Sequence, residues 1–402
     1  MTSEVPEGWK ETCVGKIISG NNKSKIQVGQ ANDTGKYKFF TSGEAVLKYD
    51  EWLVDGENLF MATGGVANVK YFDGECAYST DTYSLKSSIN TQLLYYLLTL
   101  KIDKINYSLF EGTGLKHLQK PEFKDMVIHV PKDPKEQEKI AEILEKVDEN
   151  ITITEKLINK YVAMETGLIW DLLTKGISKE GSIRNSFENN QESYIETPIG
   201  NLPKEWEVVQ LKKYKITSLY GPRFNAENYN ENGNVKTIRG TDFTKEGEIL
   251  YEQAPKALLP FHMVNTHKLK DNDILIVTTA DCGLTAVFED QGFPFIPSAY
   301  TVKYKFSEKV NPFFVKYYMT TSIAKKQVEK YIRQGTLGNL PGSDLFRFWI
   351  QIPSRKEQDR IVEIIENSRK RLFREKNNLL KYQKMKSGLM QDLLTGKVKV
   401  AA

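Results

Sequence analysis

The chain has 402 residues, of which 40% are hydrophobic and 27% are charged, and its formal net charge is +4. This length predicts two or three domains, each large enough to bury its own core, and the composition is that of a globular protein. The small positive charge permits an acidic partner such as DNA but does not require one.

The cysteines and the hydropathy exclude further classes of protein. Cys13, Cys76 and Cys282 lie far apart, so neither a disulfide framework nor a zinc knuckle is indicated. The first residues lack the apolar stretch behind a basic start that a secretory signal needs. The longest apolar run, LLYYLLTL, is too short to span a membrane. We therefore expect a soluble, cytoplasmic protein.

Residues 1–134 are predicted to form a globular domain of mixed α/β structure. Short β-like runs such as NLFMATG are separated by Gly, Asn and Asp turns, and TQLLYYLLTL has the length and composition of a helix.

Residues 135–176 are predicted to form one long helix. Their apolar residues step by four and three, which is the spacing of a coiled-coil seam, over four heptads. At a rise of 1.5 Å per residue the helix would be about 60 Å long, and Gly176 is placed to end it. The seam residues are Ile140, Leu144, Val147, Ile151, Ile158, Tyr161, Leu168 and Leu172.

The same order then recurs after a polar, poorly patterned segment at 177–196, which we interpret as a linker. Residues 197–355 are predicted to form a second domain and residues 356–396 a second long helix that Gly396 ends. The seam of this helix contains Ile361, Ile365, Leu372, Leu379, Tyr382, Leu389 and Leu393. Glu165 and Lys386 interrupt the two seams at matching positions with opposite charge, which favours a fixed pairing.

The two halves are copies of one unit. Residues 135–174 and 356–395 are related by a shift of 221 without gaps, and sixteen of the forty positions are identical. The beginnings of the halves, PEGWKE and PKEWEV, are related by a shift of only 197, so the second half contains 24 extra residues of loop.

Two similar units in one chain favour a pseudo-two-fold arrangement. Antiparallel packing of the long helices buries both seams, whereas parallel packing would require the linker to run back along a whole helix. About twenty flexible residues reach only about 25 Å on average. We therefore expect an antiparallel coiled coil with one domain at each end. Two readers held apart suit a bipartite linear target such as DNA, whose grooves repeat every 34–36 Å.

Two short segments look like parts of an adenine methyltransferase. FEGTG at 110–114 has the form of a loop that binds S-adenosylmethionine, and NPFF at 311–314 resembles a pocket motif for a flipped base. The first segment follows no apolar strand, and the second lacks its second proline. In the other half, the positions equivalent to NPFF read NTQL. We therefore interpret both segments as duplicated scaffold, in which Asn opens a helix and the G-T turn precedes a strand.

No other catalytic or metal site is indicated. His262 and His267 lack nearby cysteine or carboxylate partners, so we expect surface histidines and no bound metal. Cys282 is interpreted as a core residue in an apolar strand environment rather than a nucleophile.

The whole chain resembles the specificity (S) subunit of type I restriction-modification systems. The resemblance rests on the helix starts KEQEKIAEIL and KEQDRIVEII, on the entry ETPIGNLPKEW to the second domain, and on the DLLT helix ends. It implies an α+β fold with two target-recognition domains joined by two conserved helices in an antiparallel coiled coil.

The resemblance also implies a prokaryotic protein that is a non-catalytic subunit of a DNA methyltransferase/endonuclease. Each domain would read one half of a split, asymmetric site in double-stranded DNA. The helices would set the gap and dock two methylase subunits, which bring S-adenosylmethionine, and motor/nuclease restriction subunits would complete the restriction enzyme.

The residues that contact DNA can be suggested only from chemistry, because recognition domains of this family diverge. Arg suits guanine, Asn and Gln suit adenine, and Lys suits phosphate. The candidates are Asn21, Asn22, Lys23, Lys25, Lys36 and Lys38 in the first domain, and Tyr220, Arg223, Arg239, Asp242, Arg333 and Gln334 in the second.

Two other functions stay open at this stage. A stand-alone adenine methyltransferase would bind S-adenosylmethionine without a partner. A coiled-coil adaptor that binds only proteins would lack salt-sensitive DNA binding.

Overall fold

The computed structural model describes residues 5–333 and 336–400, which form two compact units. Unit 1 contains the chain up to Ile158 together with the residues from Glu375 on, and unit 2 contains Asn159–Arg374. Both long helices therefore contribute to both units. Within the described residues, no helix is long and apolar enough to cross a membrane.

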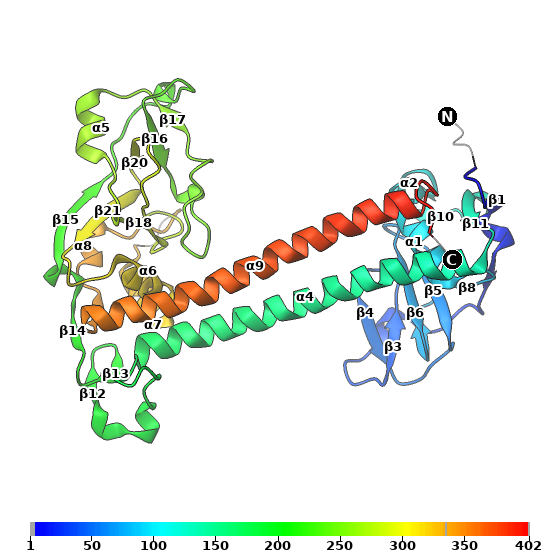
Figure 1. Cartoon of the computed structure of the whole chain (residues 1–402), viewed down its shortest axis with the longest axis horizontal. Coiled ribbons are helices and arrows are strands. Elements are labelled where there is room, and N and C mark those ends of the chain that lie inside the picture. Colours follow the sequence, from blue (N-terminus) through cyan, green and yellow to red (C-terminus); the bar gives the residue numbers. More distant parts are fainter. Residues whose placement is uncertain (1–4, 334–335, 401–402) are drawn as a thin grey trace. The chain divides into compact units, whose positions relative to one another are not determined.

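Unit 1 is built on two small sheets (Figure 1). Its four-stranded antiparallel sheet has the order β2 (Ile18–Gly20), β8 (Thr82–Ser87), β5 (Glu57–Ala62) and β6 (Val69–Asp73). Its three-stranded sheet has the order β4 (Val46–Tyr49), β3 (Tyr37–Phe40) and β7 (Cys76–Tyr78). The other elements are the pairs β1 (Trp9–Cys13) with β11 (Val127–Pro131) and β9 (Phe110–Glu111) with β10 (His117–Leu118), and the helices α1 (Thr91–Leu100), α2 (Ile102–Ser108) and α3 (Lys120–Asp125).

Unit 2 repeats both sheets in the same strand order. The four-stranded sheet is β15 (Lys215–Tyr220), β21 (Thr301–Phe306), β18 (Ile274–Val277) and β19 (Thr285–Val287). The three-stranded sheet is β17 (Lys256–Ala257), β16 (Val235–Ile238) and β20 (Phe295–Pro297). The other elements are the pairs β12 (Tyr194–Thr197) with β13 (Gly200–Pro203) and β14 (Glu207–Gln210) with β22 (Trp349–Ile352), and the helices α5 (Phe261–His267), α6 (Pro312–Thr320), α7 (Ser322–Tyr331) and α8 (Gly342–Leu345).

Much of the extra loop in the second half lies between β16 and β17. Residues 239–255 connect these strands, whereas only residues 41–45 connect the equivalent β3 and β4. The predicted internal repeat is therefore confirmed, and the insertion in the second copy has a defined place.

The long helices are α4 (Pro134–Thr174) and α9 (Arg355–Leu393). Each is joined to its domain by a buried glutamine, Gln137 or Gln358. The Gln137 side chain accepts from the N–H of Asn90 (3.1 Å) and donates to the carbonyl of Pro131 (2.8 Å). Gln358 repeats this with Asn311 (2.8 Å) and Pro353. Because a buried amide needs its partners, these bonds fix where each helix begins.

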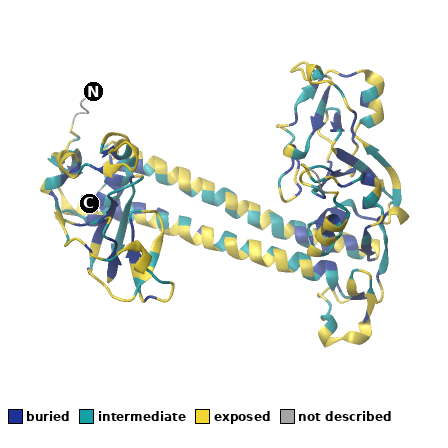
Figure 2. Cartoon of the chain, turned by 180° about the vertical axis from the view of Figure 1, so that it is seen from behind, coloured by how far each residue is buried: buried dark blue, intermediate teal, exposed yellow. Residues whose placement is uncertain are grey.

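The two long helices run antiparallel within each unit (Figures 1 and 2). In unit 1, Ile140 and Leu144 of α4 share one core with Leu393 of α9. In unit 2, Leu172 of α4 shares a core with Ile361 of α9. The predicted fold class is confirmed: it is α+β, with two similar domains and two long antiparallel helices.

All fifteen seam positions are buried or half-buried, while the residues between them are mostly exposed. The fully buried ones lie near the domains, and the half-buried ones lie in the middle of the helices. The buried set is Ile140, Leu144, Val147, Leu172, Ile361, Ile365 and Leu393, and the half-buried set is Ile151, Ile158, Tyr161, Leu168, Leu372, Leu379, Tyr382 and Leu389.

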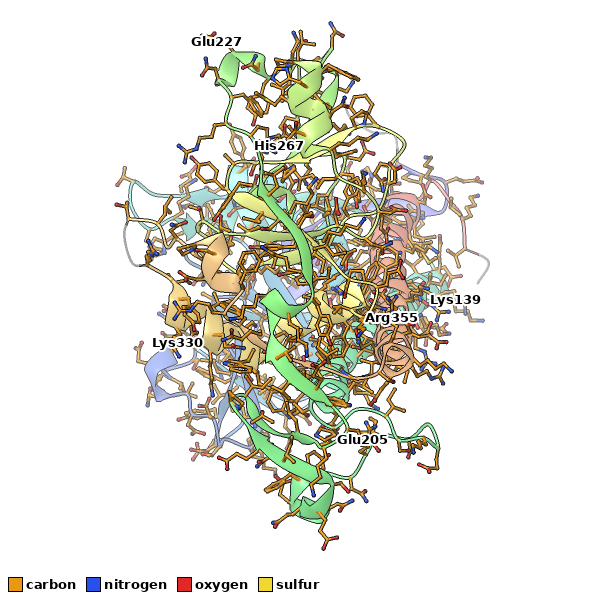
Figure 3. The ribbon with its side chains drawn as sticks, turned by 90° about the vertical axis from the view of Figure 1, so that its left-hand side faces the viewer. Lys139, Glu205, Glu227, His267, Lys330 and Arg355 are labelled. Carbon is orange, nitrogen blue, oxygen red and sulfur yellow. The ribbon has the colours of Figure 1, made fainter. Side chains whose placement is uncertain are left out.

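The segment predicted as a linker, 177–196, is tied to the rest of unit 2. Arg184 forms ion pairs with Glu357 at the start of α9 and with Glu205, which Figure 3 labels. Trp206 donates its indole N–H to the same Glu357 (3.2 Å). The polar composition of this segment predicted a linker, and its charged side chains form these local contacts.

Candidate nucleic-acid interface

One edge of the four-stranded sheet in unit 1 collects four loops. The antiparallel pairings place the ends of β2 and β5 beside the starts of β8 and β6. The N–H of Thr80 donates to the carbonyl of Ile26 (2.9 Å), which holds the segment after β2 at this edge. The N–H of Gly65 donates to the carbonyl of Lys116 (2.9 Å), which adds the loop before β10. We call residues 21–26, 63–68, 79–83 and 116–120 the basic edge of unit 1.

Positive charge is concentrated on this edge. Lys23, Lys25 and Lys116 are exposed, and the Nζ of Lys120 lies 4.5 Å from the centre of the Tyr83 ring. Burial, followed by the positive charges of Lys23 and Lys124, lowers the pKa of Lys120. Several ammonium groups beside an aromatic ring suit a phosphate backbone and the bases next to it.

Unit 2 has an equivalent edge, formed by residues 220–225, 278–284, 298–301, 333 and 336–342. The hydroxyl of Tyr220 accepts from the N–H of Gly342 (2.6 Å), and the N–H of Leu340 donates to the carbonyl of Thr278 (2.8 Å). Arg333 pairs through its backbone with Asn339 in both directions. The structure thus brings Tyr220 and Arg333 together, and Arg223 lies exposed on the segment that follows β15.

The arginines of this second edge remain available to a ligand. The Nη2 of Arg333 lies 3.8 Å from Asp344, but its side chain is 72% exposed. Arg347 lies 3.5 Å from the same carboxylate and 5.1 Å from the centre of the Tyr331 ring. Such exposed guanidinium groups, oriented by one acidic residue, suit phosphate or a base edge.

The two predicted asparagines differ in their surroundings. The side-chain amide of Asn21 donates to the Oδ1 of buried Asn58 and to the Oγ of Ser84, both at 2.8 Å, so it supports the sheet. Asn22 is exposed, and only its carbonyl is used, by the hydroxyl of Tyr78 (2.5 Å).

Four other predicted residues lie in different surroundings. Arg239 binds Asp242 through two guanidinium nitrogens (3.1 and 2.8 Å), and Asp242 is fully buried. The hydrogen bond that Arg239 donates to Asp242 raises the pKa of Arg239, so this pair closes a turn. Lys36 donates to the hydroxyl of Tyr37 (3.0 Å), and Lys38 lies 4.2 Å from the centre of the Phe72 ring. Gln334 lies outside the described residues.

The two methyltransferase-like segments are structural. Asn311 caps α6, because its Oδ1 accepts from the N–H groups of Phe313 (2.9 Å) and Phe314 (3.4 Å), and Asn90 caps α1 in the same way. FEGTG contains β9 and the start of an exposed hairpin loop that leads into β10, as the predicted turn before a strand requires. Neither segment has the geometry of a cofactor cradle.

The remaining sequence candidates show no convergence on a metal. The described residues contain no group of three or more His, Cys, Asp or Glu that suits a metal ion. The expected strand position of Cys282 is wrong: it lies in the turn after β18, and its thiol donates to the carbonyl of Thr278 (3.1 Å). Burial raises the pKa of this thiol, which disfavours a nucleophilic thiolate.

Several residues of the two edges were missed from the sequence. They are Lys116 and Lys120 in unit 1 and Tyr300 in unit 2, together with Arg347, which contacts Asp344 beside the second edge. The repeat of GTGLKHL in GTLGNL was the available signal, because residues 112–116 and the described residues 336–339 form loops beside the two sheets.

Comparisons with known proteins agree with this architecture. A family model described as "Type I restriction modification DNA specificity domain" matches residues 6–161 and 203–382. The specificity subunit of type I restriction enzyme MjaVIII from Methanocaldococcus jannaschii is 26% identical, with 98% of this chain and 94% of the relative covered. A putative specificity subunit, MjaX, from the same organism is 29% identical, with 99% and 95% covered.

Solved structures show the same fold. The S subunit of a type I restriction-modification system from M. genitalium superposes with a TM-score of 0.65 at 14% identity, over 98% of this chain and 97% of that one. A chain from a type I restriction-modification complex gives a TM-score of 0.55 at 14% identity, over 98% and 100%.

Proposed function

The chain belongs to the family of type I restriction modification DNA specificity domains, and from this we propose that it is the DNA-recognition subunit of such a system. Each unit reads one half of a bipartite, asymmetric site in double-stranded DNA. The observation that carries this proposal is the duplicated edge: the same strand ends gather exposed basic side chains beside tyrosines in both copies.

The two edges differ in chemistry as two half-sites would require. Unit 1 offers mainly lysines, which bind phosphate as point charges, whereas unit 2 offers Arg223, Arg333 and Arg347, whose planar groups can pair with guanine. Unequal side chains on equal scaffolds explain how one fold reads two different sequences.

The two segments that resemble parts of a methyltransferase have structural roles, which indicates that catalysis belongs to other subunits. Asn311 is committed to a helix cap and FEGTG to a hairpin. We propose that this subunit is not itself catalytic, and that two methylase subunits docked on α4 and α9 supply S-adenosylmethionine and the reaction. Restriction subunits join this assembly.

Two measurements on purified protein test this proposal. The chain assembled with its methylase should bind the split-site duplex with a steep loss of affinity as salt rises, because phosphate contacts release counterions. Equilibrium dialysis of the chain alone should detect no S-adenosylmethionine binding. Methylation of adenine by the chain without a partner would contradict the proposed division of labour.

A further inference from the structure

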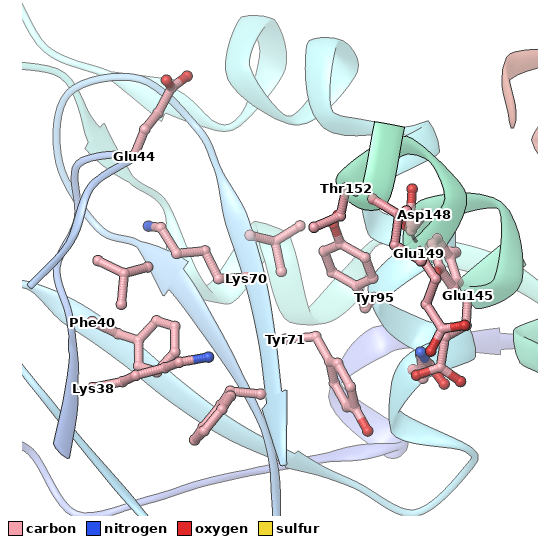
Figure 4. A pocket seen from close by; sticks show the side chains of 16 residues that line it. Lys38, Phe40, Glu44, Lys70, Tyr71, Tyr95, Glu145, Asp148, Glu149 and Thr152 are labelled. Atoms are coloured by element: carbon pink, nitrogen blue, oxygen red, sulfur yellow. Dashed lines mark hydrogen bonds between the residues drawn. The ribbon is translucent and has the colours of Figure 1, made fainter. Parts of the chain in front are cut away.

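Unit 1 contains an open cavity of about 890 Å³ between the three-stranded sheet, β6, α1 and α4 (Figure 4). Half of its sixteen lining residues are aromatic or aliphatic, with Tyr71 and Tyr95 side by side at 6.3 Å between ring centres. Val46 and Ile153 stand exposed at its border, at 46% and 61%. An apolar surface that remains open to solvent suits a partner that covers it.

Unit 2 fills the corresponding place with its own chain. The long connection between β16 and β17 lies there, and the Oε1 of Glu248 is 2.7 Å from Lys316 and 3.2 Å from Arg369. By the shift of 221, Lys316 corresponds to Tyr95 and Arg369 to Asp148. Tyr95 and Asp148 both line the cavity of unit 1. The short connection 41–45 of unit 1 cannot fill the cavity in the same way.

The cavity of unit 1 and the corresponding region of unit 2 carry opposite charges. Unit 2 presents Lys316 and Arg369 to an acidic loop, whereas the α4 wall in unit 1 presents Glu145, Asp148 and Glu149. Glu145 and Glu149 are exposed, and they form no ion pair with any described residue. An acidic wall repels a phosphate backbone and attracts a basic peptide.

The two lysines on the opposite wall do not neutralise these carboxylates. The Nζ of Lys70 donates to the carbonyl of Thr41 (3.0 Å) and to the Oδ1 of Asn68 (2.6 Å). Lys38 lies over the ring of Phe72. Their ammonium groups are thus held on the sheet side, away from α4 (Figure 4).

We propose that this cavity of unit 1 is a docking groove for a segment of the methylase subunit that carries lysine or arginine beside apolar residues. The segment takes the place that residues 239–255 occupy in unit 2, with its basic side chain against Glu145 and Glu149. The inference rests on the proposed function. It adds that the two units dock their partners unequally, because in unit 2 the connection 239–255 lies at the corresponding place.

The test measures binding of the purified methylase subunit to the full chain. The variant Glu145→Lys with Glu149→Lys should weaken this binding by about ten-fold or more, since two attractive contacts become repulsive. The control variant Asp33→Lys with Glu51→Lys makes the same charge change at exposed positions of unit 1 that lie outside the groove and outside α4 and α9, and it should bind normally. A second variant, Val46→Trp with Thr152→Trp, fills the groove from its border and should also weaken binding.

Affinity for the split-site duplex, measured for the same proteins, separates the outcomes. The proposal requires unchanged DNA affinity in both groove variants. Equal methylase affinity in wild type and groove variants would overturn it, as would tighter DNA binding by Glu145→Lys with Glu149→Lys, which would make DNA the occupant. If the wild-type chain binds the methylase but directs no methylation, the proposed function fails instead.

Discussion

Asp148 of α4 and Lys386 of α9 form an ion pair with 2.6 Å between Oδ1 and Nζ, and the repeat places a second pair, Glu165 with Arg369, at the equivalent positions. The shift of 221 relates Asp148 to Arg369 and Glu165 to Lys386. The acidic partner is on α4 and the basic partner on α9 both times. Glu165 and Lys386, which interrupt the two seams, thus both pair across the helices with an opposite charge. They do not pair with each other: Glu165 pairs with Arg369, and Lys386 pairs with Asp148.

The same difference in charge, acidic on α4 and basic on α9, extends over the whole of both helices. Helix α4 carries nine acidic and five basic side chains, and α9 carries six acidic and eleven basic ones. Pairing α4 with α9 joins opposite charges, whereas pairing two copies of α9 would join like charges. The charges thus favour pairing within one chain over association of equivalent helices from two chains.

We expect the variant Lys386→Glu to lower the free energy of unfolding by about 1–2 kcal/mol, because it places a carboxylate against Asp148 in a half-buried seam. The double variant Asp148→Lys with Lys386→Glu should restore most of this stability, and the single variant Asp148→Lys completes the cycle. Urea titration of the four proteins of this cycle gives the coupling energy. The control Lys384→Glu changes an exposed residue of the same helix, and a destabilisation equal to that of Lys386→Glu would show that the pair is unimportant.

Gly176 and Gly167 should respond oppositely to alanine. Gly176 follows α4 with φ +72°, and an added Cβ would lie 2.3 Å from Trp206 and 2.4 Å from Glu357, so Gly176→Ala should cost about 2 kcal/mol or more. Gly167 lies inside α4 with nothing within 4 Å of an added Cβ, so Gly167→Ala should stabilise the protein by up to about 1 kcal/mol. Thermal unfolding measures both, and similar effects would contradict the tight junction at Gly176.

The parts of the fold that the sequence predicted are those encoded locally or twice. The heptad spacing of Ile140 to Leu172 and the matched copy in α9 predicted the helices and their seam. The short reach of the segment between the two copies predicted their antiparallel pairing. The repeat also exposed NPFF as a helix cap, since Asn90 occupies the same position without the motif.

The parts that were missed depend on contacts between distant residues. Arg239 and Asp242 looked like two separate DNA contacts, but the turn after β16 brings them together as an internal pair. Arg184 in the segment predicted as a linker binds Glu357, 173 positions away. The groove of unit 1 depends on a loop that is short in one copy and long in the other, and its walls come from separate strands and helices. No single stretch of sequence carries these features.

His267 should make the stability of the protein sensitive to mild acid. Burial lowers the pKa of His267 from its ordinary value of 6.5, so the folded state favours the neutral ring. The unfolded chain then binds the proton first as pH falls below about 6.5, and stability decreases in that range. Between about pH 7.5 and about pH 5.5, the melting temperature of the His267→Gln variant should fall less than that of the wild type. The exposed His262→Gln provides the control, and equal acid sensitivity in all three proteins would exclude this role.

The basic edge of unit 1 should bind phosphate groups of the duplex. The variant Lys23→Gln with Lys25→Gln should weaken binding of the split-site duplex and reduce the slope of log K against log salt by about one for each phosphate that these lysines neutralise. Lys36→Gln serves as a comparison, because Lys36 donates to Tyr37 and lies away from the edge. Fluorescence anisotropy at several salt concentrations measures both. If Lys36→Gln weakened DNA binding more than the double variant does, the three-stranded sheet rather than the basic edge would form the interface.

The long helices should act as a ruler for the gap between the half-sites. Inserting one heptad into each, after Ile158 in α4 and after Arg374 in α9, adds about 10.5 Å of helix. Since base pairs are spaced by roughly 3.4 Å, the unspecified gap should lengthen by about three base pairs. Sequencing of methylated sites would reveal the new gap, and an unchanged gap would refute the ruler.

The most direct test of the central claim is single-molecule sequencing of modified bases in DNA from cells that carry this chain with its methylase, before and after replacement of residues 197–353 by those of a relative. Recognition by two separate units predicts a split motif of two short specified blocks around a fixed gap, of which the replacement changes only one. A contiguous motif, or a replacement that changes both blocks, would contradict it.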